Sequence, residues 1–133
     1  MAAQSYDRLE GVIWYDGKLV PWNEGQPPCA RATGCTMPAV VFEGERAYGG
    51  KIFKSTEHSE RLKRSANILD FEIPYSVAEI DAAKKLVVDK NGKKEAYVRP
   101  VAWRGSEMMG VSAQSQHYPS RHRELGMAEL FRP

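Results

Sequence analysis

The sequence has few of the features that mark specialised classes of protein. It contains only two cysteines, Cys29 and Cys35, with no second pair and no nearby histidine cluster. A disulfide framework or a zinc site therefore has little support, and free thiols in a reducing compartment are expected. No run approaches the ~20 apolar residues of a membrane span, and the N-terminus has no apolar signal-peptide core. A net charge of +2 gives no argument for nucleic-acid or membrane binding, so we expect a cytoplasmic protein.

The 133 residues are enough for one domain with a modest core, and 42% hydrophobic with 27% charged residues is ordinary for a globular protein. The segment Val40–Leu62 has the clearest pattern. In it, a short apolar run precedes Gly44, a Gly49-Gly50 turn leads to a second run, and Ser55 or Thr56 caps a helix. Strand, turn, strand and helix in so few residues predict an α+β fold.

Two other segments predict strands. Asp16-Gly17 lies between the apolar runs Val12–Tyr15 and Lys18–Val20, which is a strong β-hairpin signal. Glu95–Gly105 alternates between larger and smaller side chains as a strand does, and Pro100 within it indicates an edge strand or a bulge.

Apolar periodicity predicts two helices. The first runs from Ser55 to Leu69. The second begins at the capping-box pattern of Ser76 and Glu79 and ends at Asn91-Gly92. We expect a solvated face at its lysines and at those that follow it, Lys84, Lys85, Lys90, Lys93 and Lys94.

Two segments show no apolar periodicity. Asn23–Pro38 is rich in proline, glycine and alanine, which indicates a loop. Ser115–Pro133 is a polar, basic stretch in which we expect no regular element. The chain is therefore divided into a domain of residues 1–114, atypical at 23–39, and a disordered tail of residues 115–133.

Five sequence motifs resemble the N-terminal domain of the fold-type-IV pyridoxal-phosphate aminotransferases, and within that family the branched-chain amino acid aminotransferases. They are the IWYDGKLVPW run ending at Trp22, VFEGERAY (Val41–Tyr48), HSERL (His58–Leu62), AYVRP (Ala96–Pro100) and the GSEMMGV run beginning at Gly105. D-amino acid aminotransferases and aminodeoxychorismate lyases share much of this pattern, so they stay open as alternatives.

The resemblance implies a small α+β domain, an antiparallel sheet with two helices packed on it. It implies transfer of an amino group between leucine, isoleucine or valine and 2-oxoglutarate, carried by pyridoxal 5'-phosphate. In that family the lysine that forms the Schiff base lies in a C-terminal domain, and no lysine here has a matching context. We therefore expect no catalytic residue in this chain, no activity of the chain alone, and weak cofactor binding or none.

The resemblance also assigns roles to five residues. Arg61 matches a phosphate-binding arginine, whose planar fork suits a phosphate dianion. From the residues alone it is a helix-surface arginine paired with Glu57 or Glu60. Residues expected to contact substrate are Phe42, Gly44, Tyr97 and Arg99. Arg46 and Arg104 match family arginines expected to be structural, and Met37 stands where the family has a pocket tyrosine.

Codon degeneracy suggests a reason for the two atypical segments. One encoding of Gly34–Ala39, read from its third base, gives Leu-His-Tyr-Ala-Ser, which resembles the family motif before VFEG. One encoding of Ser120–Pro133, read from its second base, gives Leu-Ala-Ile-Ala-Ser-Trp-Glu-Trp-Pro-Ser-Tyr-Phe-Asp, which resembles the next family strand. The hypothesis is that the reading frame shifts in both places and truncates the family sequence.

Further expectations concern alternative functions, exposed surface and partners. An alternative function is a non-catalytic interaction module that docks on an intact homologue, as a homodimer or a mixed dimer. An unrelated small basic binding protein is disfavoured, since only the tail supports it. If the domain is alone, apolar surface around Phe42, Val101 and Trp103 should be exposed and favour aggregation. We expect no metal ligand, nucleic acid or membrane partner.

Overall fold

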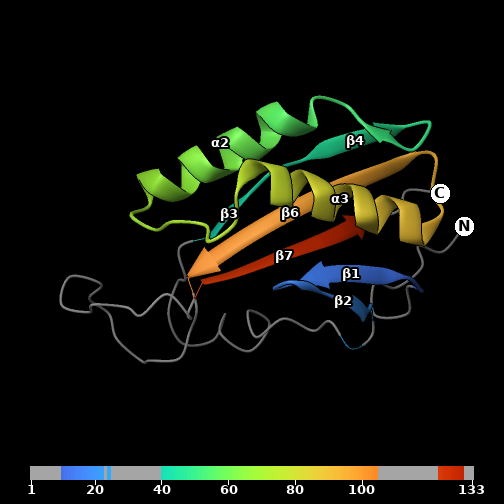
Figure 1. Ribbon diagram of the computed structural model, residues 1–133, viewed down its shortest axis with the longest axis horizontal. Coiled ribbons are helices and arrows are strands. Elements are labelled where there is room, and N and C mark those ends of the chain that lie inside the picture. Colours follow the sequence, from blue (N-terminus) through green and yellow to red (C-terminus); the bar gives the residue numbers. More distant parts are fainter. Residues whose placement is uncertain (1–9, 23, 25–39, 105–122, 131–133) are drawn as a thin grey trace, which may run out of the picture.

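A computed structural model describes residues 10–22, 24, 40–104 and 123–130, with Arg104 and residues 123–130 described as backbone alone. It confirms the predicted class: two helices lie on one face of a seven-stranded antiparallel sheet (Figure 1). The strands are β1 Val12–Tyr15, β2 Lys18–Pro21, β3 Val40–Phe42, β4 Glu45–Tyr48, β5 Lys51–Ile52, β6 Ala96–Arg104 and β7 Arg123–Leu130, and the helices are α2 Ser55–Ile68 and α3 Val77–Asn91.

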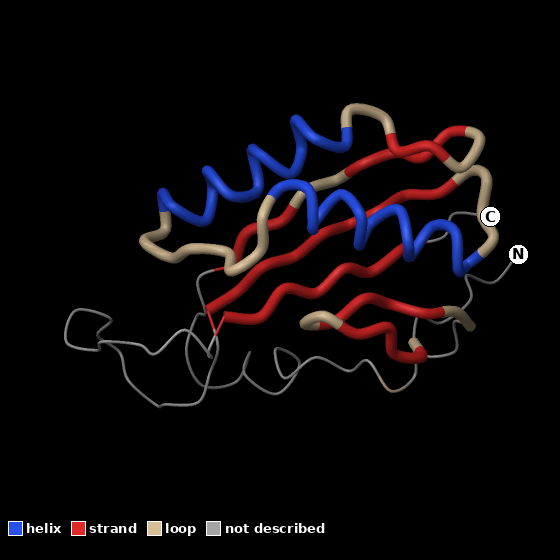
Figure 2. The backbone as a smooth tube through the Cα atoms, viewed as in Figure 1, coloured by secondary structure: helices blue, strands red, loops and turns tan. Residues whose placement is uncertain are grey.

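The strands follow the order β2-β1-β7-β6-β4-β5, and β3 also pairs with β6 (Figure 2). Strand β6 therefore lies inside the sheet, with β3 and β4 on one side and β7 on the other. The prediction that Pro100 marks an edge or a bulge is wrong. Proline has no N–H, and the missing N–H of Pro100 would point toward Glu43. Glu43 lies between β3 and β4, where the pairing with β6 is interrupted, so Pro100 is tolerated there.

Strands β3 and β4 form one continuous line along β6. Phe42 pairs with Val101 and Glu45 pairs with Val98, so the register is the same on both sides of the interruption. The Glu43 N–H still donates to the Pro100 carbonyl at 3.0 Å. Side chains along this line therefore keep alternating between the helix-covered face and the open face.

The β1–β2 hairpin confirms the prediction from Asp16-Gly17. Asp16 has φ 43° and Gly17 has φ 87°, the positive values that a tight two-residue hairpin turn requires. The Tyr75 hydroxyl donates to the Asp16 carboxylate at 2.7 Å and joins the turn to the segment before α3.

The two helices begin differently. Helix α3 has the predicted capping box: the Ser76 hydroxyl accepts from the Glu79 N–H, and the Glu79 carboxylate accepts from the Ser76 N–H. It ends at Gly92, which has φ 64°. The cap predicted for α2 is wrong, because Lys54 stands at that position with φ 52° and makes no side-chain cap hydrogen bond.

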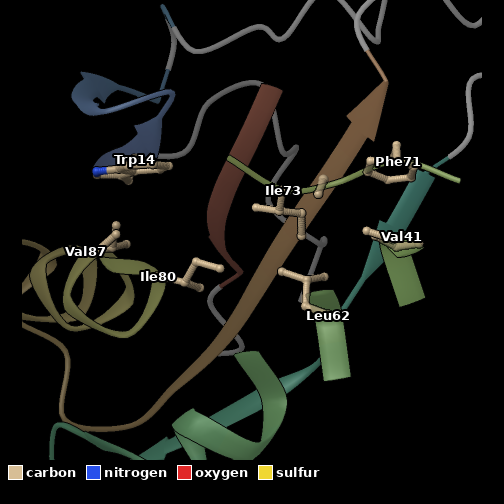
Figure 3. Packing of buried hydrophobic residues seen from close by; sticks show 10 residues of the cluster. Trp14, Val41, Leu62, Phe71, Ile73, Ile80 and Val87 are labelled. Atoms are coloured by element: carbon tan, nitrogen blue, oxygen red, sulfur yellow. The ribbon is translucent and has the colours of Figure 1, made fainter. Parts of the chain in front are cut away.

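The main core lies between the helices and the sheet (Figure 3). Helix α2 contributes Leu62 and helix α3 contributes Ile80 and Val87, which pack against strand residues such as Trp14 and Val41. Burying such side chains stabilises the fold by about 1.5–3 kcal/mol each. The Phe71–Ile73 segment between the helices also enters this core.

Three residues were expected to be exposed, and the structure agrees for only some of them. Phe42 is 57% exposed, as predicted, and Val101 is partly exposed. Trp103, in contrast, is 4% exposed, so its expected exposure is wrong; its indole contacts the Tyr15 ring, with 6.0 Å between the ring centroids.

The tail also differs from expectation. Its residues 123–130 form β7. This strand pairs with β6 from Arg104 to Tyr97 on one side and with β1 on the other. Backbone hydrogen bonds to the neighbouring strands do not depend on apolar periodicity, so the sequence pattern did not indicate this strand. The cysteines, Met37 and the atypical residues 25–39 lie outside the described residues.

Candidate functional site

Strand alternation sorts the candidate residues onto two faces. On the β3–β4 line, Phe42 and Gly44 lie on the open face, while Glu43 and Glu45 are buried on the face that the helices cover. The two carboxylates are 5% and 1% exposed. Since a buried carboxylate needs partners, these residues connect the site to the helices.

The open face brings together all four residues expected to contact substrate. Arg99 donates from Nη2 to the Tyr97 hydroxyl at 3.0 Å. Its guanidinium carbon also lies 4.7 Å from the centre of the Phe42 ring and 5.5 Å from that of Tyr97. Cation–π contacts of this kind hold the guanidinium in one place and leave donors for another group. We call this set, with Gly44, the open-face cluster.

Gly44 has a specific steric role in the cluster. A Cβ atom at this position would lie 2.4 Å from the Tyr97 hydroxyl oxygen and 3.2 Å from its ring carbon Cζ. No side chain can be accommodated at such distances without moving the tyrosine. Gly44 therefore gives Tyr97 the space in which its hydroxyl meets Arg99.

Arg99 also has an unused donor. Its Nε atom is buried and has no hydrogen-bond partner among the described residues. An unpaired buried donor is costly, and a carboxylate is the natural partner of a guanidinium fork. A hydroxyl beside a guanidinium with spare donors is an arrangement that can bind the carboxylate of a small acid.

Arg61 is held on the helix side by Glu43. Its Nε donates to Glu43 Oε1 at 2.7 Å and its Nη2 to Oε2 at 2.6 Å, a bidentate pair. The His58 Nδ1 lies 2.8 Å from the same Oε2. The sequence-based alternative of pairing with Glu57 or Glu60 is wrong, because Glu43, between β3 and β4, supplies a buried carboxylate with the matching fork geometry.

This pair leaves Arg61 able to bind an anion. The hydrogen bond from Arg61 is the main cause that holds the pKa of Glu43 below its ordinary value, so this carboxyl is charged at neutral pH. The side chain of Arg61 stays 56% exposed, and its Nη1 edge is not used by Glu43. Guanidinium N–H groups on a fixed edge suit the oxygens of an anion such as a phosphate group.

A second carboxylate, Glu45, pairs with Lys84. The Lys84 ammonium donates to Glu45 Oε2 at 2.9 Å and Oε1 at 3.1 Å, and it also lies 3.2 Å from Asp81. Its side chain is 0% exposed. The prediction of a solvated lysine is therefore wrong for Lys84, although it holds for Lys85, Lys90, Lys93 and Lys94.

Sequence reasoning missed the roles of Glu43, His58, Glu45 and Lys84. A signal was present for three of them. Glu43 and Glu45 are two residues apart in a strand beside the buried Val41, so period-two alternation turns both inward. Lys84 follows Ile80 by four residues and precedes Val88 by four, so it lies on the apolar stripe of its helix.

The described part of the chain holds no group of three or more histidine, cysteine, aspartate or glutamate side chains that could bind a metal ion. Within the same residues, neither helix is long and apolar enough to cross a membrane.

A family model matches the part of the chain that forms this fold and site. The amino-transferase class IV model covers residues 40–128, which include the open-face cluster and Arg61. The chain belongs to the class IV aminotransferase family.

Three relatives show which members it is similar to. A Rickettsia bellii protein named "Probable branched-chain-amino-acid aminotransferase" is 46% identical over 99 residues, 74% of this chain and 34% of that protein. The Pseudomonas aeruginosa branched-chain-amino-acid aminotransferase is 43% identical over 108 residues, 78% of this chain and 35% of the relative. The solved structure of a T.th. branched-chain amino acid aminotransferase with pyridoxamine 5'-phosphate gives a TM-score of 0.77 at 35% identity, covering 91% of this chain and 40% of that one.

The chain therefore spans about a third of the length of the curated relatives it matches, in their N-terminal part. The expected recognition as the N-terminal domain of this group is confirmed.

Proposed function

We propose that this chain supplies the N-terminal wall of a branched-chain amino acid transaminase site. The observation that carries the proposal is the open-face cluster. Its four residues were each predicted to contact substrate, and they meet on one face of the sheet. The relatives named for this activity support the choice of substrate class. The proposal extends to a cytoplasmic location and to assembly with a second copy.

Each residue then has a defined task. Arg61 would bind the phosphate group of pyridoxal 5'-phosphate through the edge that Glu43 leaves free. Arg99 and the Tyr97 hydroxyl would bind the substrate carboxylate, and the exposed Phe42 ring would contact its apolar side chain. The cofactor, when bound, supplies the electron sink that transamination needs.

The 133-residue chain alone should not transaminate. Its most enclosed lysine, Lys84, is committed to Glu45 and Asp81 on the helix side and is not available to bond with a cofactor. Without a covalently reacting lysine, several powers of ten in rate are lost. The purified chain mixed with pyridoxal phosphate should therefore show no stable lysine–cofactor absorbance band, and a stable band would contradict this part of the proposal.

A hybrid enzyme tests the positive part. In the Pseudomonas aeruginosa relative, the segment that matches Val40–Arg104 is replaced by that segment of this chain, and transfer from leucine to 2-oxoglutarate is measured. We expect activity, with a loss of about a hundredfold for Arg99→Lys, because lysine cannot reproduce the fork that bonds Tyr97. Arg64→Lys, an exposed position on α2, is the matched control and should change little.

A soluble hybrid that binds pyridoxal phosphate but transfers no amino group from leucine, isoleucine or valine would contradict the proposed substrate class. Transfer from a D-amino acid instead would favour the alternative that the chain belongs with the D-amino acid aminotransferases.

We also propose that Gly34–Ala39 and Ser120–Pro133 are family sequence read in a shifted frame. Resequencing the coding DNA across codons 23–40 and 110–133, and reading it downstream in all frames, tests this. A second hybrid that takes Glu10–Arg104 adds a functional test. It should be less active than the Val40–Arg104 hybrid if the segment at 23–39 is defective, and equal activity would count against a defect there.

A further inference from the structure

Helix α2, which carries Arg61, is fixed at its first turns by α3 rather than by a cap of its own. The Ser55 hydroxyl donates to Asp81 Oδ1 at 2.8 Å, and the Ser59 hydroxyl donates to the same oxygen at 2.6 Å. The Thr56 hydroxyl donates to Oδ2 at 2.8 Å. One carboxylate of α3 therefore accepts three hydroxyl groups from the start of α2.

Lys84 connects this carboxylate to the sheet. Its ammonium has three N–H donors, and it has three groups to accept them: the Glu45 carboxylate, the Asp81 carboxylate and the Ser55 carbonyl at 2.9 Å. Every donor can be used, which is how a lysine can be fully buried. The ammonium thus joins strand β4, helix α2 and helix α3 at one point.

The Arg61 pair joins the β3–β4 line to α2, the two parts of the fold that Lys84 also joins. Glu45, bound to Lys84, lies two residues after Glu43, which holds Arg61. Ser55, whose carbonyl Lys84 binds, lies six residues before Arg61 on α2, about 9 Å along the helix axis. Lys84 therefore fixes both the β3–β4 line that carries Glu43 and the helix that carries Arg61.

We propose that Lys84 is a positioning residue for the anion site at Arg61: by joining Glu45 to the first turn of α2, it sets the distance across which Glu43 holds the guanidinium. This inference rests on the proposed phosphate role of Arg61. A buried ion pair is a poor source of net stability, because well-packed apolar residues often replace it without loss. What such residues cannot replace is the set of directional bonds to Ser55 and Glu45.

The test separates position from stability. The double variant Lys84→Met/Glu45→Met removes both charges and fills their volume, and Asp81 keeps its three hydroxyl donors. We expect its melting temperature to stay near that of the parent. Lys85→Met is the matched control, since Lys85 is the exposed neighbour on the same helix and pairs only with Asp89 among the described residues.

The first readout uses the full 133-residue chain with nitrogen-15-labelled arginine. In the double variant, hydrogen exchange at Arg61 Nε should become about tenfold faster, because exchange reports local opening and the bidentate bond to Glu43 loosens. Inorganic phosphate should then shift the Arg61 signal less than in the parent. Unchanged Arg61 exchange in a folded double variant would overturn the proposal, and the Lys85→Met chain should match the parent.

The second readout uses the Val40–Arg104 hybrid and compares the affinity for pyridoxal 5'-phosphate with that for pyridoxal, which lacks the phosphate. The double variant should lose about tenfold in the ratio of the two affinities, whereas a merely structural role would lower both equally and overturn the proposal. A parent hybrid with no preference for the phosphorylated form would refute the proposed function instead, and Arg61 exchange in the full chain would then decide the role of Lys84.

Discussion

The two faces of the β3–β4 line differ in how completely their cations are used. On the helix-covered face, every donor of Lys84 has an acceptor and the side chain is 0% exposed. On the open face, Arg99 bonds to Tyr97 but keeps a buried Nε without a partner among the described residues. A fully used cation holds elements together, whereas a cation with spare donors can take a ligand.

Arg61 combines the two situations in one side chain. One edge of its guanidinium is bound by the buried Glu43, and the side chain remains 56% exposed. Burial on one edge fixes its orientation, and exposure on the other keeps it accessible. The comparison therefore predicts that changes at Lys84 affect stability most, changes in the open-face cluster affect substrate binding most, and changes at Glu43 affect both.

The largest stability effect is expected at Lys84. Lys84→Met alone leaves Glu45 buried without its cation, and breaking a buried pair in this way costs about 3–5 kcal/mol. Urea unfolding of the 133-residue chain measures this loss. The double variant with Glu45→Met should recover most of it, because no uncompensated charge remains. A single variant as stable as the parent would show that the pair is not enclosed as described.

A large effect on substrate binding, with little effect on stability, is expected at Gly44. In Gly44→Ala the new Cβ would displace the Tyr97 ring, since it would lie 2.4 Å from the hydroxyl oxygen. In the Val40–Arg104 hybrid we expect kcat/KM for leucine to fall by about a hundredfold. Gly49→Ala tests whether the effect is local: a Cβ atom at Gly49 would have no neighbour within 4 Å, although the φ of 58° adds strain. It should retain most of the activity.

Local features of the fold were predictable from the sequence. The hairpin at Asp16-Gly17 and the capping box of Ser76 and Glu79 depend on residues a few positions apart, and both are present. The open-face residues were predictable only through the family resemblance. Their spacing alone did not distinguish them from surface residues.

The ion pairs were not predictable, because they join distant positions. Glu43 and Arg61 are 18 residues apart, and Glu45 and Lys84 are 39 apart. From the sequence, Arg61 was predicted to pair with glutamates of its own helix, and Lys84 was predicted to be exposed to solvent. Only the packing of α3 against α2 and β4 decides which carboxylate each cation meets.

A smaller, pH-dependent effect is expected at Glu43. The bond from Arg61 holds the pKa of its carboxyl below the ordinary value of 4.5, so the folded state binds this proton less readily than the unfolded chain. The stability it contributes is full above about pH 4.5 and is lost as the pH falls through the lowered value. Glu43→Gln should therefore reduce stability at pH 7 and flatten its decline in acid.

Equilibrium unfolding in urea at several pH values, from neutral down to well below the ordinary carboxyl pKa, checks this. Glu60→Gln, an exposed glutamate of α2, is the control and should keep the acid dependence of the parent. If the free energy of unfolding falls equally steeply with decreasing pH in Glu43→Gln, other carboxyl groups cause the loss of stability in acid. Asp81 is the first alternative: burial raises its pKa, but the hydrogen bonds from its three hydroxyl partners and from Lys84 together hold the pKa below its ordinary value.

The smallest effect is expected at the cap of α3, which lies outside both faces of the comparison. Ser76 and Glu79 are exposed, so water can replace their hydrogen bonds when they are lost. Ser76→Ala should cost about 1 kcal/mol, the usual cost of a lost N-cap, and should leave Arg61 exchange unchanged. Ser59→Ala, which removes a buried hydroxyl from Asp81, should cost more and accelerate Arg61 exchange. If the two serines behaved alike in both measurements, hydrogen bonds at the start of α2 would have no special part in holding the anion site.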